Sequence, residues 1–310
     1  MSKIYNRIES ITGNVITVKA DGVRYNELAQ INTQFGKSLA QVNKIDGDTV
    51  SLQVFAGGQG VSTGDEVRFL GQEMRVSFSE DLLGRIFNGS GEPRDKGPAL
   101  TENMKRIGGP SVNPTKRILA NRMMRTNIPM IDMFNTLVVS QKLPIFSGNG
   151  LPHDQLAAQI VKQASLSEDS DEKFAVVFGA MGVKHDVADF FRKTFEESGV
   201  SDHVCMFLNL ANDPVVERLL TPKVALTVAE YLAFEHNMHI LVILTDMTSF
   251  AEAMREVSSS KGEIPSRKGY PGYLYSELAT VYERAGIVTG VNGSVTQLPI
   301  LTMPNDDITH

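Results

Sequence analysis

The sequence predicts an α/β protein in two parts: a small N-terminal β-barrel over residues 1–75, then a mostly parallel sheet with helices over 76–310. Short β-like segments separated by closely spaced turns predict the barrel. From residue 141 onward, nearly continuous apolar strands alternate with helical patterns, which is typical of a parallel sheet covered on both faces. Residues 141–164 open this alternation with a strand, a Gly-rich loop and an amphipathic helix, the order found in phosphate-binding loops.

The composition indicates a globular protein with room for two domains. Its 310 residues are 42% hydrophobic and 21% charged, enough for a sizeable core. The formal net charge is −6 and Lys and Arg form no long cluster, which argues against nucleic acid as a partner. No apolar run approaches the roughly 18 residues of a membrane span, and no signal peptide opens the chain. Cys205 is the single cysteine, which fits a reducing compartment.

Two hairpins and a further strand underlie the barrel prediction. Residues 8–18 alternate between apolar and polar side chains around a Thr-Gly-Asn turn. Residues 42–45 and 49–55 flank a second turn, Asp-Gly-Asp, and residues 66–70 form the next strand. We find no group of catalytic residues in this part.

Residues 71–140 are expected to connect the two parts. A loop with a hydrophobic anchor is predicted at 82–93. Residues 127–139 carry enough apolar side chains to pack on the sheet. Three scattered basic residues are interpreted as surface or subunit contacts: Arg117, Arg122 and Arg125.

The second part is expected to alternate strands with helices. The strand candidates are residues 143–147, 174–178, 204–210, 240–245 and 295–301. Helical apolar spacing predicts helices over residues 186–198, 222–236, 249–259 and 273–285.

The Gly-rich loop has the layout of a phosphate loop without its chemistry. It comprises Ser147, Gly148, Asn149, Gly150, Leu151, Pro152, His153 and Asp154. Laid on G-x-x-x-x-G-K-[ST], Pro152 replaces the second Gly, His153 the Lys and Asp154 the magnesium-binding hydroxyl. Pro152 has no N–H to offer, a histidine is mostly uncharged near neutral pH, and Asp154 adds a negative charge. Two interpretations stay open here: a plain helix start with no ligand, or a nucleotide-binding fold whose loop is disabled.

Residues 239–246 form an apolar strand that ends in Asp246. In nucleotide-binding α/β proteins, an Asp at the carboxyl end of a buried strand holds a magnesium-bound water. The alternative is a helix N-cap, for which Asp and its neighbouring threonines are suited. Val183 follows the predicted strand at residues 174–178. It stands where an ATPase would carry the Glu that orients the attacking water. His185 is interpreted as a surface residue and not as a base.

Six stretches carry a family resemblance. They are QKLPIFSGNGLPHDQLAAQI (141–160), MFLNLANDP (206–214), ILTDMT (243–248), AMREVS (253–258), GYPGY (269–273) and PILTMPNDDITH (299–310). Together they resemble the non-catalytic B subunit of the V/A-type rotary ATPases, and the likeness spans the whole chain, including the barrel segment.

The resemblance implies a β-barrel, a central RecA-like domain and a C-terminal helical domain. It implies an A3B3 ring in which B alternates with catalytic A subunits, together with central and peripheral stalk subunits. In this family the rest of the sheet, the helical domain and the arginine finger lent to the A site follow residue 310, so the RecA-like domain is expected to be C-terminally incomplete. The protein is expected to be peripheral, on the cytoplasmic side of the cell membrane, and to reach the membrane only through the rest of the complex.

The resemblance also places a site at the interface with the A subunit, where ATP or ADP is possible; no bound cofactor or metal is assigned. The nucleotide-proximal or interface candidates are loop residues 147–154 with Asp246, Arg255, Tyr270 and Tyr273. Arg255 is expected to contact nucleotide or a neighbouring acid, with a structural ion pair as the alternative. The two tyrosines are expected to pack at the interface, or to be ordinary loop aromatics.

Two other functions stay open: an NTPase in its own right with an atypical phosphate loop, or a scaffold module derived from the fold. The absent Lys, hydroxyl and Glu argue against the NTPase, because phosphoryl transfer needs its charge neutralised by cations. The coupling ion, H⁺ or Na⁺, and the direction of operation are not encoded in these residues.

Overall fold

The computed structural model describes residues 3–5, 7–34, 36–55, 57–58, 60–77, 79–100, 104–107, 113–166 and 172–309. The chain divides into two compact units. Unit 1 consists of Met1–Arg75, Pro214–Glu217 and Glu252–Gly272. Unit 2 consists of Val76–Asp213, Arg218–Ala251 and Tyr273–His310.

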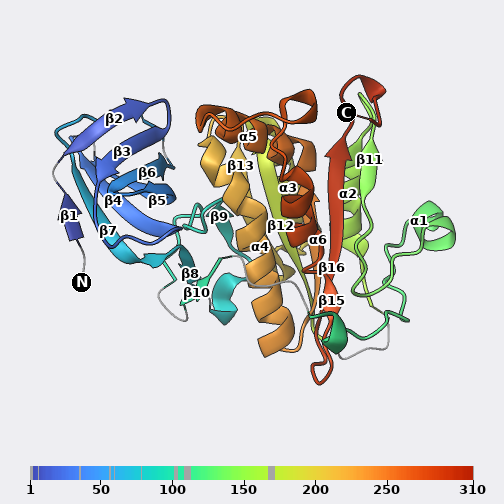
Figure 1. Cartoon of the computed structure of the whole chain (residues 1–310). Coiled ribbons are helices and arrows are strands. Elements are labelled where there is room, and N and C mark those ends of the chain that lie inside the picture. Colours follow the sequence, from blue (N-terminus) through green and yellow to red (C-terminus); the bar gives the residue numbers. More distant parts are fainter. Residues whose placement is uncertain are drawn as a thin grey trace. The chain divides into compact units, whose positions relative to one another are not determined.

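Unit 1 contains a seven-stranded antiparallel sheet in the order β1-β7-β4-β5-β6-β3-β2 (Figure 1). The strands are β1 (Lys3–Tyr5), β2 (Ile8–Thr12), β3 (Val15–Lys19), β4 (Glu27–Thr33), β5 (Gly36–Asp46), β6 (Thr49–Val54) and β7 (Glu66–Glu73). Both expected hairpins are confirmed, since β2 pairs with β3 and β5 pairs with β6 in antiparallel register.

Alternation of side chains along these strands builds the core of the barrel. In β3, Ile16 and Val18 are fully buried, whereas Lys19 at the end of the strand is exposed. Successive side chains of a strand point to opposite faces, and in β3 the interior side chains are therefore every second residue. The sheet encloses Ile8, Ala29, Ile31, Ala40, Val42, Val50, Leu52, Val54, Val67 and Phe69, among others.

Unit 2 is built on a second sheet, of order β11-β16-β14-β12-β13-β9, whose neighbours along this path are all parallel. The strands are β9 (Ile86–Asn88), β11 (Ile145–Ser147), β12 (Phe174–Val183), β13 (Val204–Leu210), β14 (His239–Thr245), β15 (Gly286–Ile287) and β16 (Ser294–Thr302). β15 pairs antiparallel with β16, and β8 (Arg75–Ser77) pairs separately with β10 (Met104–Arg106). The predicted mostly parallel sheet is confirmed.

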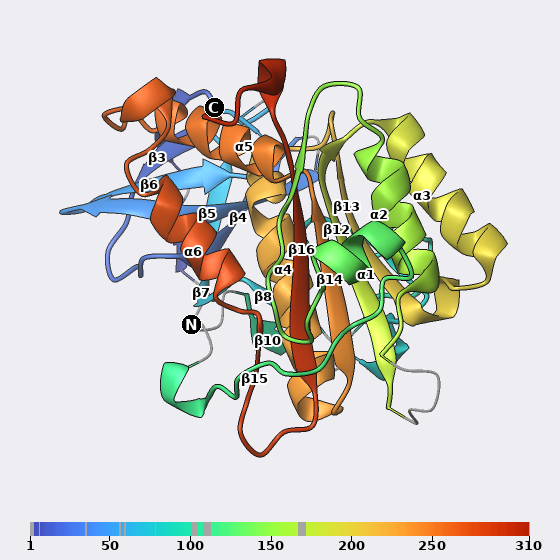
Figure 2. The same cartoon turned by 90° about the vertical axis from the view of Figure 1, so that its right-hand side faces the viewer.

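Helices cover both faces of this sheet (Figure 2). Helices α2 and α3 lie on one face, and α4 and α6 lie on the other. The helices are α1 (Pro129–Phe134), α2 (His153–Gln163), α3 (His185–Ser198), α4 (Val215–Glu235), α5 (Met247–Ser260) and α6 (Leu274–Tyr282). α4 begins seven residues before the predicted start at Pro222, which lies inside the helix. Pro favours the first turn of a helix, but the apolar residues ahead of it already have helical spacing.

Two segments differ from the sequence-based prediction. The expected loop at 82–93 contributes β9, which joins the parallel sheet beside β13, and Phe87 stacks on Phe207 with ring centroids 5.4 Å apart. In 127–139 the expected packing is only partly present. Leu137 is fully buried, whereas Met133 and Phe134 in the short helix α1 are 72% and 70% exposed. Six helical residues are too few to bury a whole apolar set against the sheet.

The aromatic cluster between β12 and α3 predicts where unit 2 is most sensitive to substitution. Phe178 is fully buried, with its ring centroid 4.4 Å from that of Phe191 and 5.7 Å from that of Phe195. Phe178→Ala should lower the free energy of unfolding by about 3–5 kcal/mol, because it removes a large side chain and leaves a cavity. Urea titration followed by circular dichroism measures this. The control is Phe146→Ala on β11, whose side chain is 53% exposed; an equal loss in both variants would contradict the packing described.

Candidate functional site

The Gly-rich loop follows β11 at the carboxyl edge of the parallel sheet (Figure 2). Ser147 pairs with Thr302 of β16, and its carbonyl accepts a hydrogen bond of 2.8 Å from the amide of Met303. Ligands of open parallel sheets bind outside this edge. The loop therefore lies where a nucleotide phosphate would be expected in this fold.

The backbone of the loop forms a compact turn that leads into α2. The amide of Leu151 donates to the carbonyl of Gly148 at 3.3 Å, and the amide of His153 donates to that of Leu151 at 2.9 Å. Gly150 has φ +72°, a left-handed conformation that glycine adopts without steric cost. α2 begins at His153, directly after Pro152. The strand–loop–helix order predicted from the sequence is thus present.

His153 folds back onto its own loop. Its Nδ1 lies 3.1 Å from Oγ of Ser147 and 3.2 Å from the carbonyl oxygen of Leu151. A phosphate-loop Lys acts as a full positive charge on a flexible stem. The imidazole instead is engaged in local contacts and replaces neither feature.

A carboxylate from the far end of the chain occupies an amide of the loop. Oδ1 of Asp306 accepts a hydrogen bond of 2.7 Å from the amide of Asn149. The same oxygen would lie 2.6 Å from a Cβ placed on Gly148, so glycine at 148 gives the carboxylate room to approach. Phosphate loops use such backbone amides to hold the phosphate, and here the protein supplies the anion itself.

Asp246 connects β14, α5 and β16. Its Oδ1 accepts from the amides of Thr248 at 2.9 Å and Thr302 at 3.2 Å, and its Oδ2 accepts from Oγ1 of Thr302 at 2.6 Å. The peptide bond between Thr245 and Asp246 is cis. The contact with Thr248 is that of a helix N-cap, the alternative left open by the sequence.

Carboxylates gather around the start of α2. Burial raises the pKa of Asp154, the negative charges of Asp246 and Asp186 raise it further, and His153 opposes them. The Nε2 atom of His153 lies 3.6 Å from Oδ1 of Asp154. An incoming β- or γ-phosphate would meet these negative charges as well as the one on Asp306.

At the end of β12, the position expected for a water-orienting Glu is taken by an apolar residue. Val183 is buried and ends the strand. His185 is exposed, as expected, and its Nε2 lies 3.1 Å from Oδ1 of Asn212. The guanidinium of Arg218 lies against Gly182 at this end of the strand. A Cβ placed on Gly182 would be only 2.8 Å from its Nε, so glycine leaves room for the arginine.

Arg255 and Tyr270 belong to unit 1, whereas the loop, Asp246 and Tyr273 belong to unit 2. Arg255 forms an ion pair with Glu252, and its guanidinium lies 5.3 Å from the ring centroid of Tyr270. The hydroxyl of Tyr270 donates to Glu252, and burial raises the pKa of Tyr270 to about 12. This ion pair lies within the chain itself. Tyr273, directly before α6, is 42% exposed.

Sequence reasoning missed Asp306 and Arg218 as members of this edge. Asp306 and Asn149 are 157 residues apart in the sequence, and no spacing rule links them. The sequence analysis used residues 304–306 only as part of the resemblance at 299–310 and assigned Asp306 no role.

The comparisons with known proteins agree with this architecture. Residues 127–310 match the model of the ATP synthase alpha/beta family, nucleotide-binding domain, and residues 8–71 match that family's beta-barrel domain. This chain belongs to the ATP synthase alpha/beta family. Its relatives within the family include V-type ATP synthase beta chains, as the resemblance of the six stretches predicted.

Three of these beta chains show the extent of the similarity. The V-type ATP synthase beta chain of Treponema denticola is 60% identical over 310 residues, and beta chain 1 of Treponema pallidum is 56% identical over 310 residues. Beta chain 2 of Clostridium tetani is 51% identical over 315 residues. Each alignment covers 100% of this chain, and 70%, 70% and 68% of the respective relative.

Two further observations concern metal binding and membrane crossing. Among the described residues, no three His, Cys, Asp or Glu side chains are grouped so that they would hold a metal ion. The described helices include none with the length and apolar character needed to cross a membrane.

The environment of Asp154 predicts that replacing this residue by Asn stabilises the fold in a pH-dependent way. Because the folded state raises the pKa of Asp154 above its ordinary value of 3.8, the ionised carboxylate is unfavourable above that raised pKa. Asp154→Asn should therefore raise the free energy of unfolding at pH 7. The gain should vanish as the pH falls through the raised pKa toward 3.8, since Asp154 is then protonated in both states.

Chemical denaturation at several pH values measures the effect. Asp189→Asn on α3 is the control, because its side chain is 62% exposed. A loss of stability at pH 7 in Asp154→Asn would contradict the carboxylate cluster.

Proposed function

We propose that this chain is a non-catalytic B-type subunit of a V-type ATP synthase or rotary ATPase. In this proposal it alternates with catalytic A subunits in an A3B3 ring and completes their ATP sites from across the interface. It is held at the cytoplasmic side of the membrane by the rest of the complex, including the central and peripheral stalk subunits. The printed names of its relatives, V-type ATP synthase beta chains, support this assignment.

One observation carries the non-catalytic part of the proposal: acids stand where a phosphate loop needs cations and free amides. Asp306 accepts the amide hydrogen of Asn149, Asp154 stands at the position of the magnesium-binding hydroxyl, and His153 contacts its own loop. Phosphoryl transfer depends on positive charge around the transferred group. A loop built in this way favours neither the binding of a triphosphate nor its hydrolysis.

The other two functions lose support for separate reasons. An independent NTPase would need a base near β12, where Val183 is buried and apolar. A scaffold module unrelated to rotation is less consistent with beta-chain relatives 51–60% identical over the full length of this chain. Arg255 and Tyr270, held by Glu252 in unit 1, are proposed to lie near the neighbouring subunit, as is Tyr273 of unit 2.

Restoring the loop chemistry separates a disabled phosphate loop from a plain helix start. The triple variant Pro152→Gly, His153→Lys and Asp154→Thr regains an amide, a cation and a hydroxyl, and loses one carboxylate. ATP affinity should rise by about tenfold or more, with no hydrolysis, because Val183 supplies no base. Titration with a fluorescent ATP analogue measures binding.

The matched control adds the same charge in α3, with Asp189→Thr and Glu197→Gln. If the restored loop binds ATP no better than the unmodified chain, the loop is only a helix start. If the triple variant hydrolyses ATP, the lack of a base at Val183 does not explain why the unmodified chain is inactive.

Assembly and hydrolysis test the role of the subunit. The chain alone should release phosphate from ATP at the background rate, because its loop lacks the necessary charges. Mixed with the A subunit of the same complex, it should elute as an alternating ring with equal amounts of the two chains, measured by size-exclusion chromatography with light scattering. Steady turnover by the chain alone would favour the NTPase, and a failure to join A would favour the scaffold module.

A further inference from the structure

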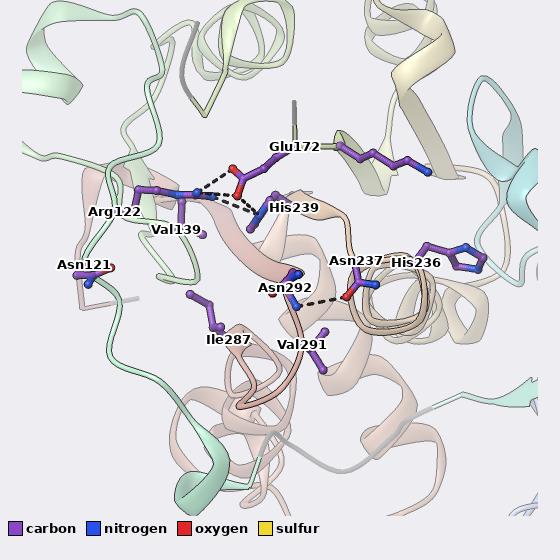
Figure 3. A pocket seen from close by; sticks show the side chains of 11 residues that line it. Asn121, Arg122, Val139, Glu172, His236, Asn237, His239, Ile287, Val291 and Asn292 are labelled. Atoms are coloured by element: carbon purple, nitrogen blue, oxygen red, sulfur yellow. Dashed lines mark hydrogen bonds and ion pairs between the residues drawn. The ribbon is translucent and has the colours of Figure 1, made fainter. Parts of the chain in front are cut away.

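A cavity of about 510 Å³ marks the amino edge of the unit 2 sheet, the edge opposite the Gly-rich loop (Figure 3). His239, which begins β14, lines it together with Lys173 and Asn292, which precede β12 and β16. In its wall, Nε2 of His239 lies 3.2 Å from Nη2 of Arg122 (Figure 3). Nδ1 of the same ring lies 2.7 Å from Oγ of Ser294, the first residue of β16. A side-chain contact therefore joins the amino ends of β14 and β16.

The carboxyl ends of the same two strands are joined as well. The amide and the hydroxyl of Thr302, the last residue of β16, both donate to Asp246, which directly follows β14. The carbonyl oxygen of Thr302 accepts a hydrogen bond of 2.7 Å from Oγ1 of Thr248 in α5. Because β16 is fixed at both ends, movement of the chain that follows it begins after Thr302.

Residues 303–309 follow this fixed strand and contact the Gly-rich loop; we call them the strap. Two hydrogen bonds join the strap to the loop. The amide of Met303 donates to the carbonyl oxygen of Ser147 at 2.8 Å, and the amide of Asn149 donates to Oδ1 of Asp306 at 2.7 Å. The first lies directly beside the fixed strand. Asn149 and Asp306 are both exposed, so the second contact can open without disturbing the hydrophobic core.

The backbone of the strap is strained where it makes this second contact. Asn305 has φ +56° and Asp306 has φ +58°, so two successive residues other than glycine are left-handed. Asn and Asp tolerate this conformation better than most residues, but it still has a cost and persists where the surroundings hold it in place. The hydrogen bond from Asn149 thus holds the strap in a conformation that its backbone disfavours.

Gly148 leaves room for the same carboxylate. A Cβ placed on Gly148 would lie 2.6 Å from Oδ1 of Asp306, which is too close, and 3.6 Å from Cδ1 of Leu151, which is an ordinary contact. Gly148 does not have the left-handed backbone of Gly150, so its backbone is compatible with alanine. A methyl group at position 148 would therefore displace the carboxylate and leave the rest of the loop in place.

We propose that the strap is a two-position latch on the Gly-rich loop. In the closed position, which this structure shows, Asp306 accepts the amide hydrogen of Asn149. In the open position the strap leaves the loop and its left-handed residues relax. The hydrogen bond to a charged acceptor favours the closed position and the backbone strain opposes it, so the open position is a minor, accessible state.

The closed position is autoinhibitory, because an amide that donates to Asp306 is not available to an external acceptor. This control comes from the strap and is separate from the side-chain replacements within the loop. It is also independent of the subunit's role in a ring, because strap and loop both belong to unit 2.

Hydrogen exchange of the full chain, followed by mass spectrometry of peptides that cover the loop and the strap, measures opening of the latch. Asp306→Asn removes the charge and keeps a side chain that tolerates the left-handed backbone. It should raise exchange in both peptides about fivefold, because a neutral acceptor forms a hydrogen bond about half as strong. Gly148→Ala should raise exchange at least as much, because it breaks the contact from the loop side. Unchanged slow exchange in β14 shows that both variants fold.

Asp307→Asn is the matched control. It removes the same charge one residue further along, where the carboxylate accepts a hydrogen bond of 2.8 Å from the amide of Thr309 within the strap. It should leave exchange in the loop unchanged. The double variant Gly148→Ala with Asp306→Asn should exchange no faster than Gly148→Ala alone, because both changes act on one hydrogen bond. Unchanged loop exchange in both single variants, an equal rise with Asp307→Asn, or additive rises in the double variant would overturn the proposal.

Discussion

The carboxyl edge of the parallel sheet is held together by carboxylates, where a nucleotide-binding site of this fold uses cations. Asp246 links the end of β14 to Thr248 at the start of α5 and to Thr302 of β16. Asp306 links the segment after β16 to the Gly-rich loop through the amide of Asn149. These hydrogen bonds to charged acceptors are stronger than neutral ones. In the loop itself, the carboxylate of Asp306 binds a backbone amide of the kind that would hold a phosphate.

This arrangement has a cost at one position. Asp154 is partly desolvated and faces Asp246 and Asp186, so its ionised form is unfavourable. Local violations of this kind are expected at functional sites. In the proposed ring, a neighbouring subunit would supply the countercharge to this surface.

Local sequence signals were sufficient for most of the fold. Gly13 and Gly47 mark the two barrel hairpins, both with positive φ, and the apolar runs of β13 and β14 gave strands within a residue of their observed bounds. The failures came from long-range packing. The exposure of Phe134, the entry of β9 into the sheet and the contact of Asp306 with Asn149 depend on segments far apart in the chain. No periodicity encodes such pairings, which is why Arg218 and the amino-edge cavity were also not foreseen.

The acid in the first turn of α2 has a reason that begins with helix direction. In a parallel α/β unit the connecting helices run against the strands, so their N-termini lie at the carboxyl edge and their C-termini at the amino edge. The macrodipole favours acids at the first and cations at the second. Asp154 in the first turn of α2 follows this preference, and Lys173 at the amino edge is consistent with it. A functional phosphate loop must place a Lys against this preference, at the N-terminus of a helix, and the binding of phosphate compensates for it. Here His153 stands in place of that Lys, and the burial that raises the pKa of Asp154 outweighs what the helix dipole contributes.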